Sequence, residues 1–203
     1  MMTRRQVLLL GGALWVAACT NLIPGTGEGP QLYVLTPKTT FAPDLPKVDW
    51  QLLVDVPIAP AEIDTDRIVL QPTPYTVDKF ANAAWPDRAT VMVQTLLVES
   101  FESTRKITAI ARESVGLRAD YVLKPELRKF TAVYDTPTGP PIISIILNVR
   151  LVKMPERAII AQKTFNQRER ASRNEMEAIV EAFDEALGKI LKRTIEWTLT
   201  TAR

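Results

Sequence analysis

The sequence predicts an α+β fold, a mainly antiparallel sheet packed by two helices of which the longer one is C-terminal. Two observations favour it. Three consecutive segments, 121–134, 143–151 and 158–167, alternate apolar and polar side chains and are separated by short turns, which is typical of an antiparallel meander. The last thirty residues instead carry apolar side chains at spacings of three and four, which is typical of an amphipathic helix.

The C-terminal helix is the clearest single element. Ser172 and Glu175 have the spacing of a capping box, which predicts the start of a helix between them. Its apolar stripe consists of Met176, Ile179, Val180, Phe183, Leu187, Ile190, Leu191 and Ile195. A stripe of this length can cover one face of a sheet, and burial inside the molecule is its expected role.

Shorter elements precede the meander. Strands are expected at 31–35, 51–56, 67–71 and 75–80, and Pro72-Thr73-Pro74 separates the last two as a hairpin would. Trp85-Pro86-Asp87 predicts a helix start, because proline in a first turn loses no hydrogen bond. That helix is expected to run to Phe101 or Thr104 and to be largely buried, since much of its circumference is apolar.

Composition excludes most familiar enzyme classes. The 203 residues contain no His and a single Cys, which excludes His-dependent catalytic dyads, His-ligated zinc and disulfide frameworks. Only Gly116, Gly139 and Gly188 follow residue 29, too few for a phosphate-binding glycine loop. No metal and no cofactor is therefore expected.

The first eighteen residues have the pattern of an export signal. Arg4 and Arg5 precede a short apolar stretch, 7–16, which is too short to span a bilayer as a helix. We therefore expect residues 1–18 to be a signal peptide, 19–30 a flexible tether rich in Gly and Pro, and 31–203 a single α+β periplasmic domain. Removing the signal leaves 23 basic and 23 acidic residues, a balance that gives no support to nucleic-acid binding.

Cys19 stands where the signal ends. Val16-Ala17-Ala18-Cys19 resembles the lipobox of bacterial lipoproteins, and this resemblance implies that Cys19 carries diacylglycerol and an N-terminal acyl chain such as palmitate. The competing interpretation is a buried structural cysteine. Thr20, in place of the Asp that retains such proteins in the inner membrane, implies the outer membrane. The two arginines fit either twin-arginine export or the general secretory route.

The whole mature chain resembles the ABC-type transport auxiliary lipoproteins of the paraquat-inducible protein C type. The residues that carry the resemblance are Cys19, Tyr33-Val34-Leu35, Trp85-Pro86, Ala119-Asp120-Tyr121-Val122-Leu123, Phe130, Phe165, Ala178, Ala182, Ala186 and Trp197. The resemblance implies a non-catalytic outer-membrane lipoprotein facing the periplasm. Its implied partners are an inner-membrane ABC permease and ATPase and a mammalian-cell-entry (MCE) domain protein, in systems that move phospholipid or other hydrophobic molecules. The resemblance is also compatible with a homo-oligomer of this protein.

Two other function classes compete with this interpretation. A binding module of another envelope machine, such as a cell-wall synthase activator or an outer-membrane export pore, would combine the same lipobox, tether and small domain. An anchored enzyme would use Ser103 and Lys106, which have the S-x-x-K spacing of penicillin-binding enzymes. The further motifs of those enzymes are absent from the sequence, so chance explains the spacing.

Three aromatic residues are candidates for a docking or lipid-contact surface: Tyr75, Phe80 and Trp85. Core packing is the competing interpretation, because aromatic side chains usually bury their large apolar area.

Overall fold

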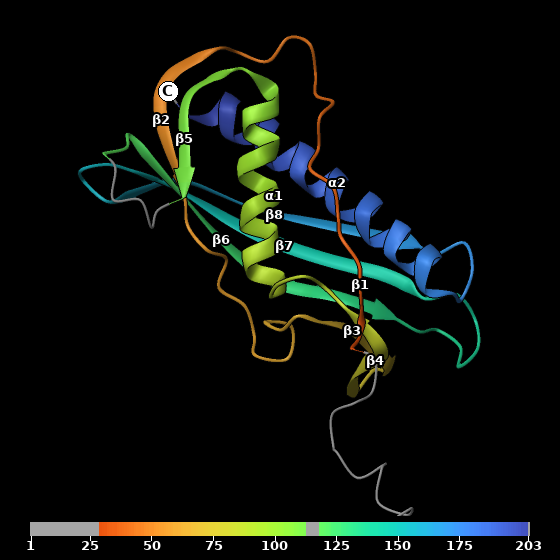
Figure 1. Ribbon diagram of the computed structural model, residues 1–203. Helices are drawn as coiled ribbons and strands as arrows, with labels where there is room; N and C mark the ends of the chain where they lie inside the picture. Colours follow the sequence, from red (N-terminus) through yellow and green to blue (C-terminus); the bar gives the residue numbers. More distant parts are fainter. Residues whose placement is uncertain (1–28, 113–117, 203) are drawn as a thin grey trace, which may run out of the picture.

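The computed structural model describes residues 29–112 and 118–202 (Figure 1). Two helices and an eight-stranded sheet make up this part of the chain, which confirms the α+β class. In chain order the elements are β1 (Gln31–Leu32), β2 (Val48–Val54), β3 (Arg67–Thr73), β4 (Thr76–Ala84), α1 (Ala89–Thr104), β5 (Ile107–Arg112), β6 (Tyr121–Val133), β7 (Ile142–Lys153), β8 (Ala158–Arg170) and α2 (Met176–Thr201).

The long strands β6, β7 and β8 form the predicted antiparallel meander. Tyr121 of β6 lies opposite Lys153 of β7, and Val133 lies opposite Ile142, so the two strands pair along their full length. β8 pairs with β7 in the same way, from Ala158 to Arg170. β6 and β7 are largely buried, whereas β8 is largely exposed and its one buried residue is Phe165.

The sheet as a whole is mixed, and the prediction of a mainly antiparallel sheet is wrong. The second edge of β6 takes two partners: β2 pairs with its beginning at Tyr121–Leu123 and β3 with its end at Ala132–Val133, both in parallel. β5 is parallel to β2, and β1 is parallel to β4. Parallel neighbours need a crossover, and α1 provides one between the β3–β4 hairpin and β5.

The predicted hairpin is formed by β3 and β4. Thr73 and Thr76 lie opposite each other at its tip, with Pro74 and Tyr75 between them. Nearer the body the register shifts so that β4 has extra residues, and Asn82 there adopts a left-handed conformation with φ of 53°. Asparagine tolerates this region better than most residues. β1 pairs with β4 just beyond this irregularity, at Ala83 and Ala84.

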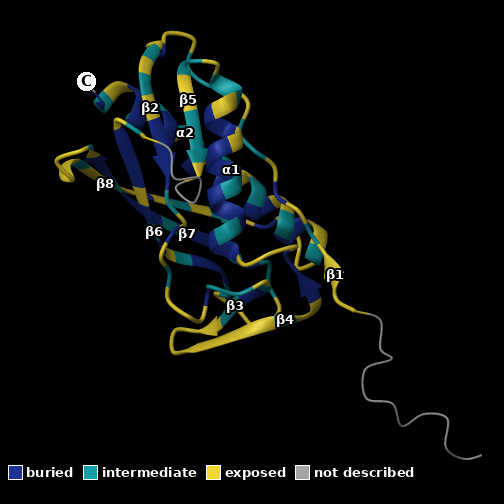
Figure 2. Ribbon diagram, turned by 60° about the vertical axis from the view of Figure 1, so that its left-hand side comes forward, coloured by how far each residue is buried: buried dark blue, intermediate teal, exposed yellow. Residues whose placement is uncertain are grey.

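Both helices lie on one face of the sheet, and the hydrophobic core lies between the helices and that face (Figures 1 and 2). Trp85, immediately before α1, packs its ring at 5.9 Å from Phe130 of β6 and 5.4 Å from Phe183 of α2. Phe130 and Phe183 are themselves 5.0 Å apart, so three distant segments meet in one aromatic cluster. Gln94 adds a polar tie, because its side-chain amide donates to the Val54 carbonyl at 2.9 Å.

Helix α2 buries the predicted stripe, but its start differs from the prediction. The helix begins at Met176 with Glu175 as its N-cap, and Glu175 makes no side-chain capping hydrogen bond. The Glu175 carboxylate is instead 3.1 Å from the Arg173 side chain. The capping box predicted from Ser172 and Glu175 is therefore wrong, because the helix begins three residues later than that pattern requires and Glu175 pairs with Arg173 instead.

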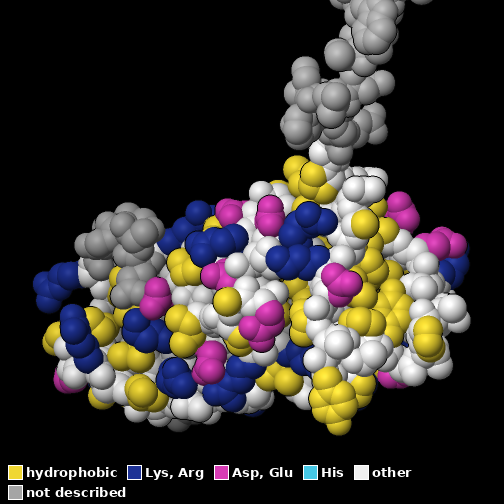
Figure 3. Space-filling model, turned by 90° about the horizontal axis from the view of Figure 1, so that it is seen from below, with side chains coloured by type: hydrophobic (Ala, Val, Ile, Leu, Met, Phe, Trp, Pro, Cys, Tyr) yellow, Lys and Arg dark blue, Asp and Glu magenta, His cyan; other side chains and the backbone are white. Residues whose placement is uncertain are grey.

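The opposite face of the β6–β8 meander carries no helix. Figure 3 shows this side of the molecule, on which Lys and Arg side chains are interspersed with acidic ones and apolar side chains gather toward the right. Side chains alternate across a strand, so the odd-numbered residues of β7 from Ile143 to Leu151 face the helices and the even-numbered ones face outward.

Replacing Trp85 with Ala should destabilise the fold strongly. Its side chain is 1% exposed, and removing a buried Trp leaves a cavity that costs about 3–5 kcal/mol. Urea unfolding followed by circular dichroism measures this loss, and Trp85→Phe should lose clearly less because it keeps a ring in the cluster. If Trp85→Ala unfolds at the wild-type urea concentration, the aromatic cluster does not stabilise the fold.

Candidate functional site

The three aromatic candidates occupy different environments. Trp85 is buried in the core, as the competing interpretation anticipated, and offers no surface to a partner. Phe80 is half-buried and packs against the core. Tyr75 is 96% exposed at the tip of the β3–β4 hairpin. The fold therefore does not bring the three together as one surface, and Cys19 lies outside the described residues.

A groove of about 560 Å³ lies between β8, the last turns of α2 and the segment at 42–45. Its apolar lining comes from Phe165, Trp197 and Leu45, and charged side chains line it as well: Lys163, Arg193 and Glu196. The two aromatic rings meet edge to face, 6.1 Å apart. Sequence reasoning missed this groove, because the 42–45 segment lies more than a hundred residues before the β8 and α2 residues that form the other two walls.

Polar contacts hold the groove together. The Glu196 carboxylate accepts a hydrogen bond from the Ala42 backbone N–H at 2.9 Å, which ties the 42–45 segment to α2. The Lys163 ammonium lies 5.4 Å from the centre of the Phe165 ring, within reach of a cation–π interaction. An apolar floor beside charges of both signs can receive an amphipathic molecule or peptide segment. Apolar linings with a few placed charged groups are typical of binding sites.

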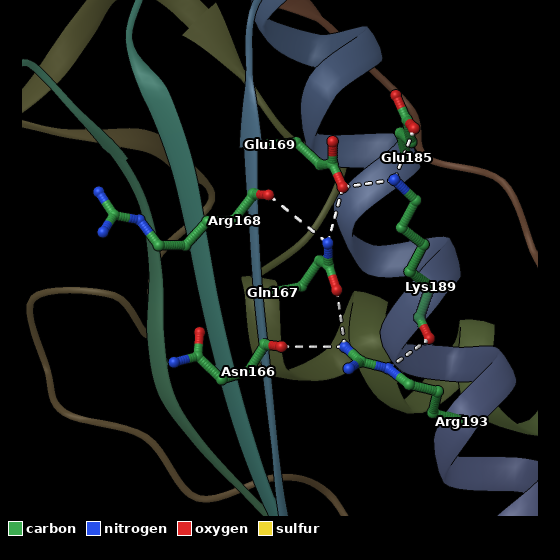
Figure 4. Close-up of polar contacts among 7 residues, drawn as sticks. All are labelled: Asn166, Gln167, Arg168, Glu169, Glu185, Lys189 and Arg193. Atoms are coloured by element: carbon green, nitrogen blue, oxygen red, sulfur yellow. Dashed lines mark hydrogen bonds and ion pairs between the residues drawn. The ribbon is translucent and has the colours of Figure 1, made fainter.

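Next to the groove, α2 is bound to the outer edge of β8 (Figure 4). The Arg193 guanidinium donates to the Asn166 carbonyl at 3.0 Å and to the Gln167 side-chain oxygen at 2.9 Å. The Lys189 ammonium bridges the carboxylates of Glu169 and Glu185. These contacts cover part of an edge strand that would otherwise present unpaired backbone groups to another chain.

The charges in this region stabilise one another. A hydrogen bond from Lys189 lowers the pKa of Glu169 below its ordinary value, against the opposing effect of burial, and Gln167 assists at 2.7 Å. The pKa of Lys189 is raised, first by Glu169 and then by Glu185. Both groups therefore keep their charges through the neutral range, which is the pattern of a structural ion pair and not of a group that exchanges protons near neutrality.

The structure gives the S-x-x-K residues an ordinary helix-end role. The Ser103 hydroxyl lies 2.8 Å from the carbonyls of Lys38 and Ser100, and no hydrogen bond within the described residues joins it to Lys106. Across residues 29–112 and 118–202, no group of Asp, Glu, Cys or His side chains is placed to hold a metal ion. In that same part of the chain, neither α1 nor α2 has the length and hydropathy that a membrane-spanning helix requires.

Glu169→Gln should weaken the protein more at neutral pH than in acid. Because the folded-state pKa of Glu169 is depressed, its ion pair contributes stability above the ordinary carboxyl value of 4.5 and loses it as the pH falls through the folded value. We expect a loss of about 0.5 kcal/mol at pH 7, since Lys189 is partly exposed, and a smaller loss at about pH 3.

Urea unfolding at the two pH values measures the difference. Glu181→Gln is the matched control, an exposed residue of α2 with no ion pair in the described part of the chain, and it should change stability little at either pH. A Glu169→Gln loss of equal size at both pH values would contradict the ion-pair account.

Comparison with known proteins shows where this fold occurs. The crystal structure of protein XCC0632 from Xanthomonas campestris is 34% identical, with a TM-score of 0.79 over 84% of this chain and 95% of that one. A second crystal structure shares the fold at 15% identity and a TM-score of 0.67, over 84% of this chain and 99% of that one. Protein bll6063 of Bradyrhizobium diazoefficiens is 29% identical over 167 residues, which are 82% of this chain and 44% of that protein's length.

The family model for ABC-type transport auxiliary lipoprotein components matches residues 33–194. This range runs from the residue after β1 into the last turns of α2. It includes the meander, the aromatic cluster and the groove lining except Glu196, Trp197 and Thr200. The chain belongs to the family of ABC-type transport auxiliary lipoprotein components.

Proposed function

We propose that this protein is a non-catalytic auxiliary component of an ABC transport system, anchored by lipid on Cys19 to the periplasmic face of the outer membrane. The observation that carries the proposal is the family match over residues 33–194, directly downstream of a lipobox. The partners we propose are an MCE-domain protein and an inner-membrane permease and ATPase. The cargo is phospholipid or another hydrophobic molecule.

The anchor follows from the position of Cys19. Each buried methylene contributes about 0.8 kcal/mol of membrane affinity, so a diacylglyceryl group with a further acyl chain holds a protein stably where one chain does not. Only residues 20–30 separate Cys19 from β1, so the folded body stays near the bilayer that holds the lipid. Such a body suits a role at the membrane end of a periplasmic conduit.

The candidate site supports a role in recognition. The groove beside β8 combines an apolar floor with charges that are already paired to the fold, through Glu196 to Ala42 and Arg193 to Asn166. Groups held in this way orient a bound partner without reacting with it. A component that holds or positions other proteins of a transport system needs this and no catalytic centre.

Cys19→Ser should release the protein from membranes. Without the thiol no diacylglyceryl group can be attached, and the described helices provide no alternative span. Flotation of membrane vesicles on a density gradient measures this, and Ser103→Ala serves as a control that should float as the wild type does. A Cys19→Ser protein that still floats with outer-membrane vesicles would contradict the lipid anchor.

Crosslinking in cells followed by purification of the anchored protein should identify the partners. The proposal predicts an MCE-domain protein or an ABC permease, and predicts that the wild type captures it whereas the Trp85→Ala protein, with its core disrupted, does not. Capture of a cell-wall synthase or an outer-membrane export pore in its place would assign the protein to a different envelope machine.

A further inference from the structure

The helix-free side of the meander carries more basic than acidic side chains. The strand register places six basic residues on this side and a single acidic strand residue, Glu126. We call this surface the cationic face; its basic residues are Lys124, Arg128, Lys129, Arg150, Arg168 and Arg170. In Figure 4 the Arg168 side chain points away from α2, toward this face.

Ion pairs neutralise part of this charge. The Lys124 ammonium lies 2.9 Å from the Asp55 carboxylate, and the Arg170 guanidinium lies 2.7 Å from the Asp135 carboxylate. Glu126 is shared between Arg128 at 2.9 Å and Arg150 at 3.2 Å, so two cations have one carboxylate between them. These arginines lower the pKa of Glu126, which keeps it ionised and still leaves the group net positive. Within the described residues, no ion pair involves Lys129 or Arg168.

The helical side has the opposite charge. Helices α1 and α2 together contain seven acidic and three basic residues. Exposed Glu99, Glu102, Glu177 and Glu181 lie on this side. The domain therefore has a basic sheet side and an acidic helical side, and an anionic surface attracts the first and repels the second.

The tether joins the domain at β1, the edge strand of the sheet beside β4. β1 is paired to β4 beside the β3–β4 hairpin, and Figure 1 shows these strands at the lower edge of the molecule, the side viewed in Figure 3. A coil as long as residues 19–30 has a root-mean-square span of about 20 Å. The thirteen residues of β6 alone extend about 43 Å, so the lipid holds this end of the domain much closer to the bilayer than the far end.

Apolar side chains accompany the cations. Ile58 is 63% exposed and is bridged to Glu126, so it lies on the same side of the sheet. At the tip of the β3–β4 hairpin, Tyr75 is almost fully exposed and Val77 is 52% exposed. Tyrosine is enriched at membrane–water interfaces, where its ring is in an apolar layer and its hydroxyl remains hydrated.

We propose that the cationic face, with the β3–β4 hairpin beside it, lies on the surface of a phospholipid bilayer that contains anionic lipid. The proposal rests on acylation of Cys19, because the tether brings the face to the bilayer. Lys129 and Arg168 meet the lipid phosphates, and Tyr75 enters the interfacial layer. The groove and the acidic helices then face the periplasm, where they remain accessible to partner proteins.

A reporter on each side of the acylated protein tests this orientation. Acylation blocks the thiol of Cys19, so Asn166→Cys on the cationic side and Glu181→Cys on the helical side can each carry a fluorophore. The proteins are reconstituted in vesicles of phosphatidylethanolamine and phosphatidylglycerol with nitroxide-labelled headgroups. Quenching should be several-fold stronger for the Asn166→Cys reporter than for the Glu181→Cys reporter.

Charge reversal identifies the cause. Lys129→Glu with Arg168→Glu, in the Asn166→Cys protein, should reduce quenching several-fold, because each cation near an anionic surface contributes separately to binding. Lys47→Glu with Arg105→Glu makes the same charge change outside the cationic face and should leave quenching unchanged. Flotation of every variant reports the anchor independently.

The outcomes separate the two proposals. A protein that fails to float contradicts the anchor, and this inference with it. A protein that floats but shows equal quenching at both reporters, or quenching that the Lys129→Glu and Arg168→Glu changes do not reduce, contradicts the membrane orientation alone. In that case the cationic face is left for a protein partner.

Discussion

The packing of Trp85 against Phe130 and Phe183 determines how the rest of the molecule is arranged. Trp85 connects β4 to α1, Phe130 lies in the middle strand of the sheet, and Phe183 lies in α2. Because the three rings must meet, both helices are confined to one face of the sheet. The meander, the hairpin and the last helix then have fixed relative positions, and the surfaces left over are those available for binding.

Those surfaces differ in chemistry in a way that suits a membrane-anchored transport component. The groove between β8 and α2 is lined by Phe165 and Trp197 and by charges already bound to the fold. The helix-free side of the meander carries an excess of basic side chains, and the strand that follows the tether lies at the β4 edge of the same sheet. One side can therefore meet phospholipid while another remains open to proteins. Both surfaces are suited to binding, which agrees with a family of transport auxiliary components.

The strands, the two helices and the α+β class could be predicted because each depends on local periodicity. The pairing of β2 and β3 with opposite ends of β6 could not, since alternation in a strand gives its faces and not its neighbours. The groove could not be predicted either, because Leu45 is far in sequence from Phe165 and Trp197 and only the fold brings them together. The cationic face was partly visible in the alternation of Lys124 and Arg128, but Arg168 joins it only through the register of β8.

The central claim is that an acylated Cys19 holds a recognition domain against a bilayer. Mass spectrometry of the N-terminal peptide from protein purified out of native membranes tests it most directly. The account predicts a chain that begins at Cys19 and carries the mass of a diacylglyceryl group and a further acyl chain. Material that retains residues 1–18, or that begins at Cys19 with a free thiol, would contradict it.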